Sequence, residues 1–328
     1  LLPGDPIGGD RLFEGIEIHH DEIDRGDVML GESGHVGAVA TNGENAGVNA
    51  WMQRFDPAVE HLREAGVVGD ADYLQTALLQ QGGGAAAGGG RGAVSLELVG
   101  RAAGHADRIA LDTPEGTFTY EDLLGASAEA ANRILAGRHD LDGARVCFLV
   151  TPGWPYVVTQ WAIWRAGGVA VPMAVSHPPA ELAYVLDDAE PDVVVADPAL
   201  LDRIEGLAAE RGLTLLTTSE LAEPPGPLPS VSPDRPAMML YTSGTTGRPK
   251  GVVTTHANIQ AQVDSLVEAW GWREDDHILL HLPLHHVHGI VNVLTCALWS
   301  GARCEMMPRF DPVDVWERLA RGHLTLYM

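Results

Sequence analysis

Eleven consecutive residues, Tyr241 to Gly251, concentrate the chemical groups that bind phosphate. The run Tyr-Thr-Ser-Gly-Thr-Thr-Gly-Arg-Pro-Lys-Gly carries three glycines, four Ser or Thr hydroxyls, one arginine and one lysine. Glycine lets the backbone turn sharply, and consecutive backbone N–H groups then form a concave site for an anion. Hydroxyls and a lysine ammonium add donors suited to phosphate. The stretch therefore predicts a loop that holds a nucleoside triphosphate by its phosphates.

Lys250 is the only lysine of the chain, and every other basic residue is an arginine. Apolar residues 237–240 precede the loop and Val252-Val253 follow it, so the pattern predicts strand, tight loop, strand. The Walker loop needs Gly-Lys-Ser/Thr entering a helix. Here Pro249 precedes Lys250 and disfavours helical geometry at the residue before it. A polar hairpin with a simply exposed lysine is the alternative interpretation.

A second candidate is the run His281-Leu-Pro-Leu-His285-His286-Val-His288-Gly289. It follows a predicted strand, 278–282, and ligands of α/β sheets bind beyond the carboxyl ends of strands. Imidazoles at this position are suited to a substrate carboxylate or to charge on a phosphate. A turn whose imidazoles form only local hydrogen bonds is the alternative.

No metal site is expected in either histidine-rich stretch. Pro283 excludes a helix that would align two imidazoles from the 281–288 run, and the run has no neighbouring Cys or carboxylate. The cluster His19-His20-Asp21-Glu22-Asp24 contains ligand types, but no matching group follows at zinc-like spacing. A solvated acidic turn explains that cluster better.

The two stretches resemble known motifs. YTSGTTGRPKG is similar to the phosphate loop of the adenylate-forming (AMP-binding) superfamily, which includes acyl-CoA synthetases, peptide-synthetase adenylation domains and luciferases. LPLHHVHGIVN resembles the acyl-pocket motif of malonyl-CoA synthetases and their acyl-CoA synthetase relatives. The resemblance covers about residues 94–328, and the first motif is the more specific of the two.

The resemblance implies an ATP-dependent acyl-CoA synthetase that acts on malonate, a short dicarboxylate or a fatty acid. Such an enzyme forms an acyl-adenylate with release of pyrophosphate, and CoA then displaces AMP; ATP, Mg²⁺ and CoA are the implied cofactors. Lys250 and His286 would be the catalytic residues. The implied ATP-binding residues are Thr242, Ser243, Gly244, Thr245, Thr246, Gly247, Arg248 and Lys250. The implied substrate-binding residues are His285, His286, His288 and Gly289.

The sequence also departs from the family pattern. It shows no adenine-binding Gly-rich segment, no Tyr-Gly-x-Thr-Glu motif and no ribose-binding Asp, and one lysine cannot serve both the loop and the family's small C-terminal domain. We therefore expect a partial chain that completes neither half-reaction alone. An amino-acid or aryl-acid adenylation domain and a non-catalytic nucleotide-binding remnant stay open as alternatives.

The elements that must position these motifs alternate between helix and strand. Strands are expected at 145–150, 169–172, 192–196, 214–216, 278–282, 303–307 and 324–328. Helices are expected after the capping-box pattern Thr119–Asp122 and at 154–166, 178–189, 198–211, 257–270, 289–300 and 312–321. This alternation predicts an α/β fold with doubly wound, mostly parallel sheets and flanking helices, the incomplete large domain of the adenylate-forming fold.

The chain is expected to divide near residue 92. Residues 1–92 are acidic and weakly patterned, with one candidate helix at 58–65 and a low-complexity Gly/Ala linker at 82–90, so they predict an irregular or mispredicted extension. Residues 93–328 form the expected enzyme domain. A proline-rich stretch within 222–235 is expected to separate two sheets or subdomains.

Composition narrows the partners. The net charge of −24 disfavours nucleic acid and anionic membranes, so small molecules are the expected partners. ATP, CoA and a carboxylate are anions too, so local hydrogen-bond donors and cations must overcome the repulsion from the negatively charged chain. No run of about 20 apolar residues is present. Three scattered cysteines in apolar surroundings and the lack of a signal pattern predict a cytoplasmic protein.

Overall fold

The computed structural model describes residues 96–224, 226–242 and 248–328. The expectations for residues 1–92, including the His19–Asp24 cluster, the helix at 58–65 and the linker at 82–90, lie outside the described residues. Loop residues 243–247 lie outside them as well. The described residues fall within one compact unit.

The larger sheet has six strands in the order β6-β5-β3-β4-β7-β8. The strands are β3 (Arg145–Leu149), β4 (Val169–Pro172), β5 (Val193–Ala196), β6 (Thr214–Thr217), β7 (Pro236–Thr242) and β8 (Lys250–Thr255). All neighbours pair in parallel except β7 and β8, which form an antiparallel hairpin. The predicted strand–loop–strand around the phosphate motif is confirmed.

The smaller sheet has five strands in the order β11-β9-β10-β1-β2. They are β1 (Ile109–Thr113), β2 (Gly116–Thr119), β9 (His277–Leu280), β10 (Arg303–Met306) and β11 (Leu326–Tyr327). Only the β1–β2 pair is antiparallel. The α/β class with mostly parallel sheets is therefore as the sequence predicts.

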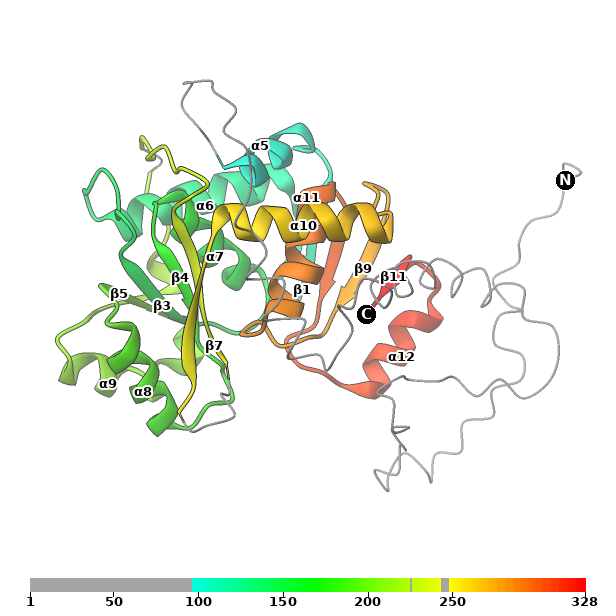
Figure 1. Ribbon diagram of the computed structural model, residues 1–328. Helices are drawn as coiled ribbons and strands as arrows, with labels where there is room; N and C mark the ends of the chain where they lie inside the picture. Colours follow the sequence, from blue (N-terminus) through cyan, green and yellow to red (C-terminus); the bar gives the residue numbers. More distant parts are fainter. Residues whose placement is uncertain (1–95, 225, 243–247) are drawn as a thin grey trace, which may run out of the picture. The chain divides into compact units, whose positions relative to one another are not determined.

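Helices cover the sheets in layers. They are α5 (Glu97–Gly104), α6 (Tyr120–Leu135), α7 (Trp154–Arg165), α8 (Pro179–Ala189), α9 (Glu205–Glu210), α10 (His256–Trp270), α11 (Cys296–Ser300) and α12 (Pro312–Ala320). Figure 1 shows α10 running from the end of β8 in the six-stranded sheet across to the five-stranded sheet. Because strand side chains alternate between faces, Val146 and Phe148 of β3 join the core shared by both sheets, whereas Cys147 and Leu149 pack with α8 residues.

Local sequence signals explain where key helices begin and end. The Thr119 hydroxyl accepts the backbone N–H of Asp122, and the Asp122 carboxylate accepts the Thr119 N–H, so the predicted capping box starts α6. Thr255 and Asn258 cap α10 in the same way, and Gly271, in a left-handed conformation, ends it. Helix α10 is thereby fixed directly after the hairpin strand β8.

Three expectations need correction. The helix predicted at 198–211 is a 3₁₀ segment, Pro198–Arg203, followed by the short α9, with Ile204 between them. The helix predicted at 289–300 is a π-helix, His288–Thr295, that continues into α11. The 222–235 stretch does not separate two sheets, because β7 after it pairs with β4 before it (Ala170 opposite Met238).

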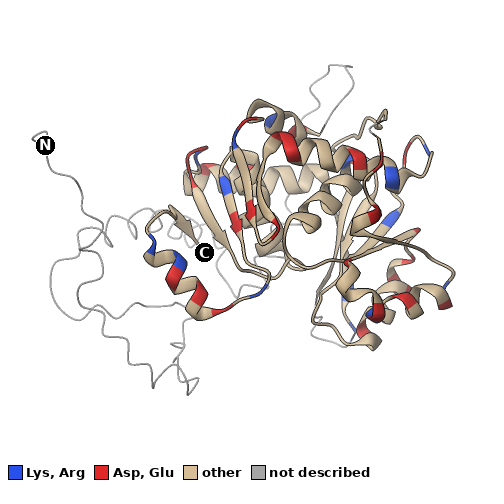
Figure 2. Ribbon diagram, turned by 180° about the vertical axis from the view of Figure 1, so that it is seen from behind, with Lys and Arg blue, Asp and Glu red and all other residues tan. Residues whose placement is uncertain are grey.

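Charge is spread over the surface of the described part. Figure 2 shows acidic positions on many of the helices, and α12 carries residues of both signs. No helix of the described residues is long and apolar enough to cross a membrane. The three cysteines, Cys147, Cys296 and Cys304, are buried, and burial raises the pKa of each thiol.

Candidate functional site

The β7–β8 hairpin holds both ends of the phosphate motif. Thr242, the last residue of β7, lies opposite Lys250, the first residue of β8. Lys250 and Arg248 are exposed. A Cβ at Gly251 would meet the terminal methyl group of Met239 at 2.0 Å, so a larger residue there would require that side chain to move. The hairpin therefore presents the two cations of the motif at its loop end.

Helix α8 supplies the surface against which the motif ends. The Tyr184 hydroxyl donates to the Pro249 carbonyl at 2.6 Å, and the Arg248 guanidinium lies 5.8 Å from the centre of the Tyr184 ring. The Tyr241 hydroxyl donates to the Asp188 carboxylate at 2.8 Å. Burial, and then this hydrogen bond to Asp188, raise the pKa of Tyr241, so the phenol keeps its proton. These contacts fix the backbone that leaves the loop.

The histidine-rich turn is held by buried contacts of its apolar residues. Leu284 and Val287 are buried, and the Tyr156 hydroxyl of α7 donates to the Leu284 carbonyl at 2.7 Å. Gly289 is buried, and a Cβ there would lie 2.7 Å from the Pro283 carbonyl oxygen. Glycine is thus needed for close backbone approach. The apolar residues anchor the turn, while His285 is only partly buried and His286 is exposed.

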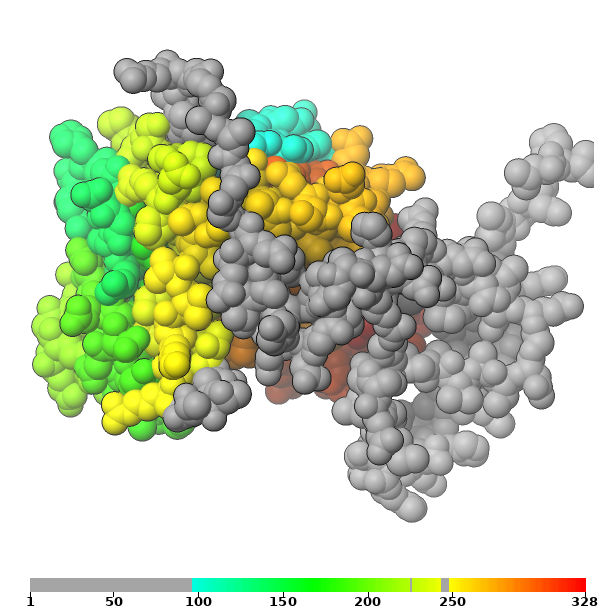
Figure 3. Space-filling view, viewed as in Figure 1, coloured from blue at the N-terminus to red at the C-terminus, as the bar shows by residue number. Residues whose placement is uncertain are grey.

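A cavity of about 640 Å³ joins the hairpin, α8 and the histidine turn. It is lined by His177, Ala180, Glu181, Ala183, Tyr184, Val185, Asp187, Tyr241, Arg248, Pro249, His285 and His286. Figure 3 shows the hairpin, in yellow, beside the green surface of the α8 region. The residues that line the cavity come from the segments that follow β4 and β9 and from the end of β7 with the loop after it. The cavity therefore lies beyond the carboxyl ends of parallel strands, where α/β folds bind ligands.

Three imidazoles gather at one side of this cavity. The ring centres of His285 and His286 are 4.1 Å apart, and those of His177 and His285 are 5.7 Å apart. Burial, followed by the neighbouring His286 and His177, lowers the pKa of His285 to about 4. The Nε2 atom of His177 lies 3.4 Å from a Glu181 carboxylate oxygen. At neutral pH, His285 is an uncharged group with both a donor and an acceptor nitrogen.

The π-helix after the turn is tied to α10. The Gln262 amide donates to the Asn292 side-chain oxygen at 2.7 Å, and the Thr295 hydroxyl donates to the Ile290 carbonyl at 2.7 Å. π-Helical turns are rare and occur frequently at functional sites. Since α10 begins where β8 ends, one continuous segment links the hairpin to the helix that carries the histidine motif.

The structure brings together only some of the predicted site residues. Arg248, His285 and His286 line one cavity. Thr242 and Lys250 pair across the hairpin, and among the described residues neither lines that cavity; the same holds for His288, which opens the π-helix, and Gly289. Ser243, Gly244, Thr245, Thr246 and Gly247 lie outside the described residues.

Sequence reasoning missed the α8 contribution. Tyr184 and Glu181 belong to an ordinary amphipathic helix, and His177 to the turn before it, so no motif marks them. The one available signal was topological. Residues after β4 and β9 follow strands of parallel sheets, and their side chains were candidates for the same crevice.

An α/β domain with this hairpin and a ligand cavity at the carboxyl ends of its strands is typical of nucleotide-dependent enzymes. The chain belongs to the family described as "AMP-binding enzyme", whose model matches residues 98–328.

Relatives include malonate–CoA ligases. The chain is 46% identical over 230 residues to the mitochondrial malonate–CoA ligase ACSF3 of Homo sapiens, covering 66% of this chain and 40% of that protein. It is 33% identical over 248 residues to a malonate–CoA ligase of Arabidopsis thaliana, covering 66% and 40%. The ATP-bound crystal structure of MatB from Rhodopseudomonas palustris is similar with a TM-score of 0.64 at 28% identity, covering 71% of this chain and 54% of that one. The chain thus spans about two fifths of the length of these curated relatives.

Proposed function

We propose that this chain carries the phosphate-binding hairpin and the acyl-binding turn of an ATP-dependent acyl-CoA synthetase whose acid is malonate or a close dicarboxylate. One observation carries the proposal: a single cavity is lined by Arg248 of the phosphate motif and by His285 and His286 of the acyl motif. The nucleotide phosphates and the acid must meet at one place for adenylation, and this cavity is that place. The similarity to malonate–CoA ligases supports the choice of acid.

The proposed reaction has two steps, adenylation of the acid and transfer of the acyl group to CoA. A carboxylate oxygen of the acid forms a bond to the α-phosphorus of ATP, and the bond to pyrophosphate breaks. The CoA thiol then loses its proton and forms a bond to the acyl carbon, and AMP leaves with the electron pair. Arg248 and Lys250 bind phosphate oxygens, so catalysis comes from positioning and electrostatic stabilisation, without a protein nucleophile.

The carboxylate oxygens that line the cavity, the usual ligands of Mg²⁺, already pair with basic side chains. Both Asp187 oxygens accept from Arg211, at 2.7 and 3.1 Å, and Glu181 contacts His177. Mg²⁺ prefers a few carboxylates together with substrate phosphates. We therefore propose that it is held mainly by triphosphate oxygens, where it would neutralise phosphate charge.

The neutral His285 gives the acid site a distinctive property. A dicarboxylate bound beside the His177, His285 and His286 rings would favour the charged form of an imidazole and raise its pKa. Binding would then take up a proton, and malonate affinity should strengthen as pH falls toward about 4, the pKa of His285 in the chain without ligand. Acetate, which lacks the second carboxylate, should show a weaker dependence.

The test is acid-dependent exchange of labelled pyrophosphate into ATP. It is run on the 328-residue chain and on any longer product of its reading frame, with malonate, methylmalonate, acetate, longer acids and amino acids. Arg248→Ala and Lys250→Ala should lower exchange at least tenfold, whereas Arg273→Ala, in an exposed ion pair with Asp275, should leave it unchanged. Exchange with amino or aryl acids alone would favour a carrier-linked adenylation domain. Nucleotide binding without any exchange would favour a non-catalytic role.

Two sequence-based expectations stay predictions. The same exchange assay decides whether the 328-residue chain completes a half-reaction. The cytoplasmic location is tested by fractionation of the source cells, and the human relative is described as mitochondrial.

A further inference from the structure

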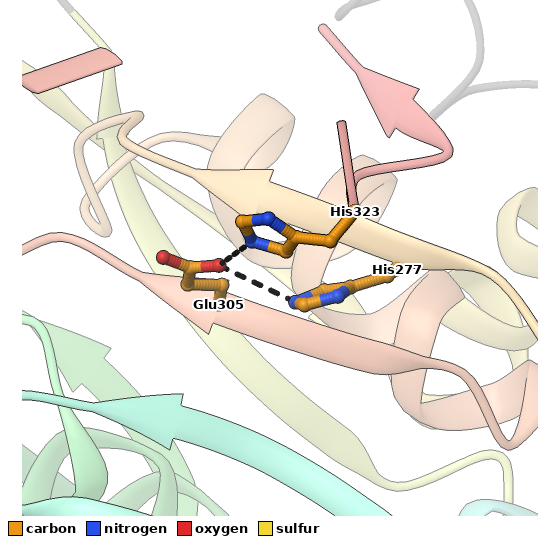
Figure 4. A group of neighbouring side chains, drawn as sticks. All are labelled: His277, Glu305 and His323. Atoms are coloured by element: carbon orange, nitrogen blue, oxygen red, sulfur yellow. Dashed lines mark hydrogen bonds and ion pairs between the residues drawn. The ribbon is translucent and has the colours of Figure 1, made fainter. Parts of the chain in front are cut away.

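A group of two histidines and one glutamate lies at the opposite end of β9 from the histidine turn. It consists of His277, which opens β9, Glu305 of β10 and His323, which precedes β11. Figure 4 shows both imidazoles directed at one carboxylate. His323 Nε2 lies 2.9 Å from Glu305 Oε2, and His277 Nε2 lies 3.4 Å from the same oxygen. One atom from each residue falls within 4.8 Å of the other two.

The buried imidazole of this group has a nitrogen that faces carboxylates without forming a short hydrogen bond. The His277 side chain is 10% exposed, and its Nε2 atom is buried and makes no hydrogen bond. That atom faces two carboxylates, Glu305 at 3.4 Å and Asp112 at 3.9 Å. A buried polar atom without a partner costs stability unless something satisfies it. Here the atom points at the centre of a set of ligand-type side chains.

The carboxylate at the centre is already oriented by its contacts with His277, His323 and Arg318. Arg318 binds the Oε1 atom, and this leaves Oε2 toward the two imidazoles. Contacts of this kind, which orient a ligand from behind, accompany metal sites.

The imidazole on β9 is fixed through its backbone. The His277 N–H donates to the Thr325 hydroxyl at 2.8 Å, and the Thr325 N–H returns a bond to the His277 carbonyl at 2.9 Å. The Thr325 hydroxyl also donates to Asp276 at 2.8 Å. The same segment that carries His323 is thus hydrogen-bonded to the start of β9.

We propose that His277, Glu305 and His323 form a structural binding site for a divalent transition-metal ion of the Zn²⁺ type. Ligands of a tetrahedral Zn²⁺ at 2.0–2.1 Å are separated by roughly 3.3 Å, and the separations of 2.9 and 3.4 Å bracket that value. Two imidazoles and one carboxylate suit Zn²⁺ better than Mg²⁺ or Ca²⁺, which select oxygen ligands. Water would complete the coordination.

The position assigns the ion a structural role. His277 starts β9 and the histidine turn follows its end, so the four residues of the strand, about 13 Å at 3.3 Å per residue, separate the two groups. The ion would join β9, β10 and the segment before β11, and would hold that segment to the sheet. The proposal is independent of the proposed function, because no substrate atom is involved.

The test is metal binding by the full 328-residue chain after treatment with a chelator and gel filtration. Titration with Zn²⁺, read by competition with a chromophoric chelator, should show one tight equivalent per chain. Glu305→Gln and His323→Ala should weaken its Kd at least tenfold, whereas the exposed His139→Ala should leave it unchanged. Binding should weaken in acid because metal-bound imidazoles must be deprotonated.

Two further variant sets locate the site if other histidines bind Zn²⁺. His285→Ala addresses the histidine turn, and the pair His19→Ala with His20→Ala addresses the N-terminal cluster. If the tight equivalent is lost in either of these, or if it survives unchanged in both Glu305→Gln and His323→Ala, the proposal is wrong. A hydrogen-bonded His–Glu–His group without metal would show no tight equivalent at all.

A variant that adds a spectroscopic signal tests the site even if the variants that lack a ligand fold poorly. His323 is partly exposed on a loop, so His323→Cys is expected to fold. It should retain binding, and Co²⁺ substituted for Zn²⁺ should then show a sulfur-to-metal charge-transfer band that the parent protein lacks. A Co²⁺ spectrum identical to the parent's would contradict the assignment, because a thiolate ligand at this position changes the spectrum.

Discussion

The two ends of β9 carry the same side chain in opposite electrostatic settings. At its amino end, His277 and His323 share the ionised Glu305, and Arg318 balances the charge. At its carboxyl side, His285 and His286 lie against each other, and burial with imidazole neighbours lowers the pKa of His285 to about 4. The two ends therefore differ in the groups nearest the imidazole: His277 faces the Glu305 and Asp112 carboxylates, whereas His285 packs against the rings of His286 and His177. This difference is why we propose a cation site at the first end and an acid site at the second.

The largest expected effect comes from removing the carboxylate. Glu305→Gln should lower the free energy of unfolding by about 2–3 kcal/mol, because it leaves Arg318 and two imidazoles without their shared partner. Urea denaturation with a chelator present measures this without metal. The exposed Glu205→Gln is the matched control and should stay within about 0.5 kcal/mol. Equal effects of the two changes would contradict the contrast between the ends of β9.

A neutral hydrogen bond should matter most at the carboxyl side. Tyr156→Phe removes the buried donor of the Leu284 carbonyl and should destabilise the chain by about 1–2 kcal/mol. Tyr327→Phe is the comparison variant, since its hydroxyl contacts His281 at 3.2 Å in a half-buried setting. It should cost less than half as much. A smaller effect of Tyr156→Phe would show that the turn is held by packing alone.

The two ends are expected to lose stability in different pH windows as the pH falls. The pKa of His285 is lowered in the folded chain, so its contribution to stability is complete above about pH 6.5, the ordinary imidazole value, and is lost as pH falls toward 4. The pKa of Glu305 is also lowered, so its contribution persists down to about pH 4.3, the ordinary Glu value, and declines below it. Unfolding free energies of His285→Gln should vary less than those of the parent between pH 6.5 and 4.

The smallest expected effect separates the causes of the low pKa. His286→Ala removes a neighbouring imidazole and should raise the pKa of His285, as measured by NMR titration. Because burial is the first cause and persists in the variant, the rise should be less than about one unit. A return to about 6.5, the ordinary value, would mean that the neighbour, and not burial, sets the pKa.

Local patterns were sufficient for most of the architecture. The capping box at Thr119 and the alternating apolar runs predict α6 and the parallel strands, since each signal depends on adjacent residues. The antiparallel strands β1 and β2 and the short α5 were missed, because short elements carry weak periodicity. The π-helix at His288–Thr295 was predicted only as a helix, because the apolar pattern of its residues does not distinguish π from α geometry.

The two sites differ in how visible they are in the sequence. Arg248 and His285 belong to contiguous motifs and were identified from them. His277, Glu305 and His323 come from two strands and a loop and lie 28 and 18 positions apart in the sequence, and no local spacing marks them. The parallel pairing of β9 with β10 brings Glu305 near His277, and the pairing of β11 with β9 brings the segment that carries His323.

One feature of the hairpin has a practical use. Lys250 is exposed, opens β8 and is the only lysine of the chain. A protease that cuts only after lysine therefore has one place to act, and it would divide the chain into residues 1–250 and 251–328. A bound nucleotide triphosphate should shield that bond, so the rate at which the two pieces appear on a gel reports directly whether the loop is occupied.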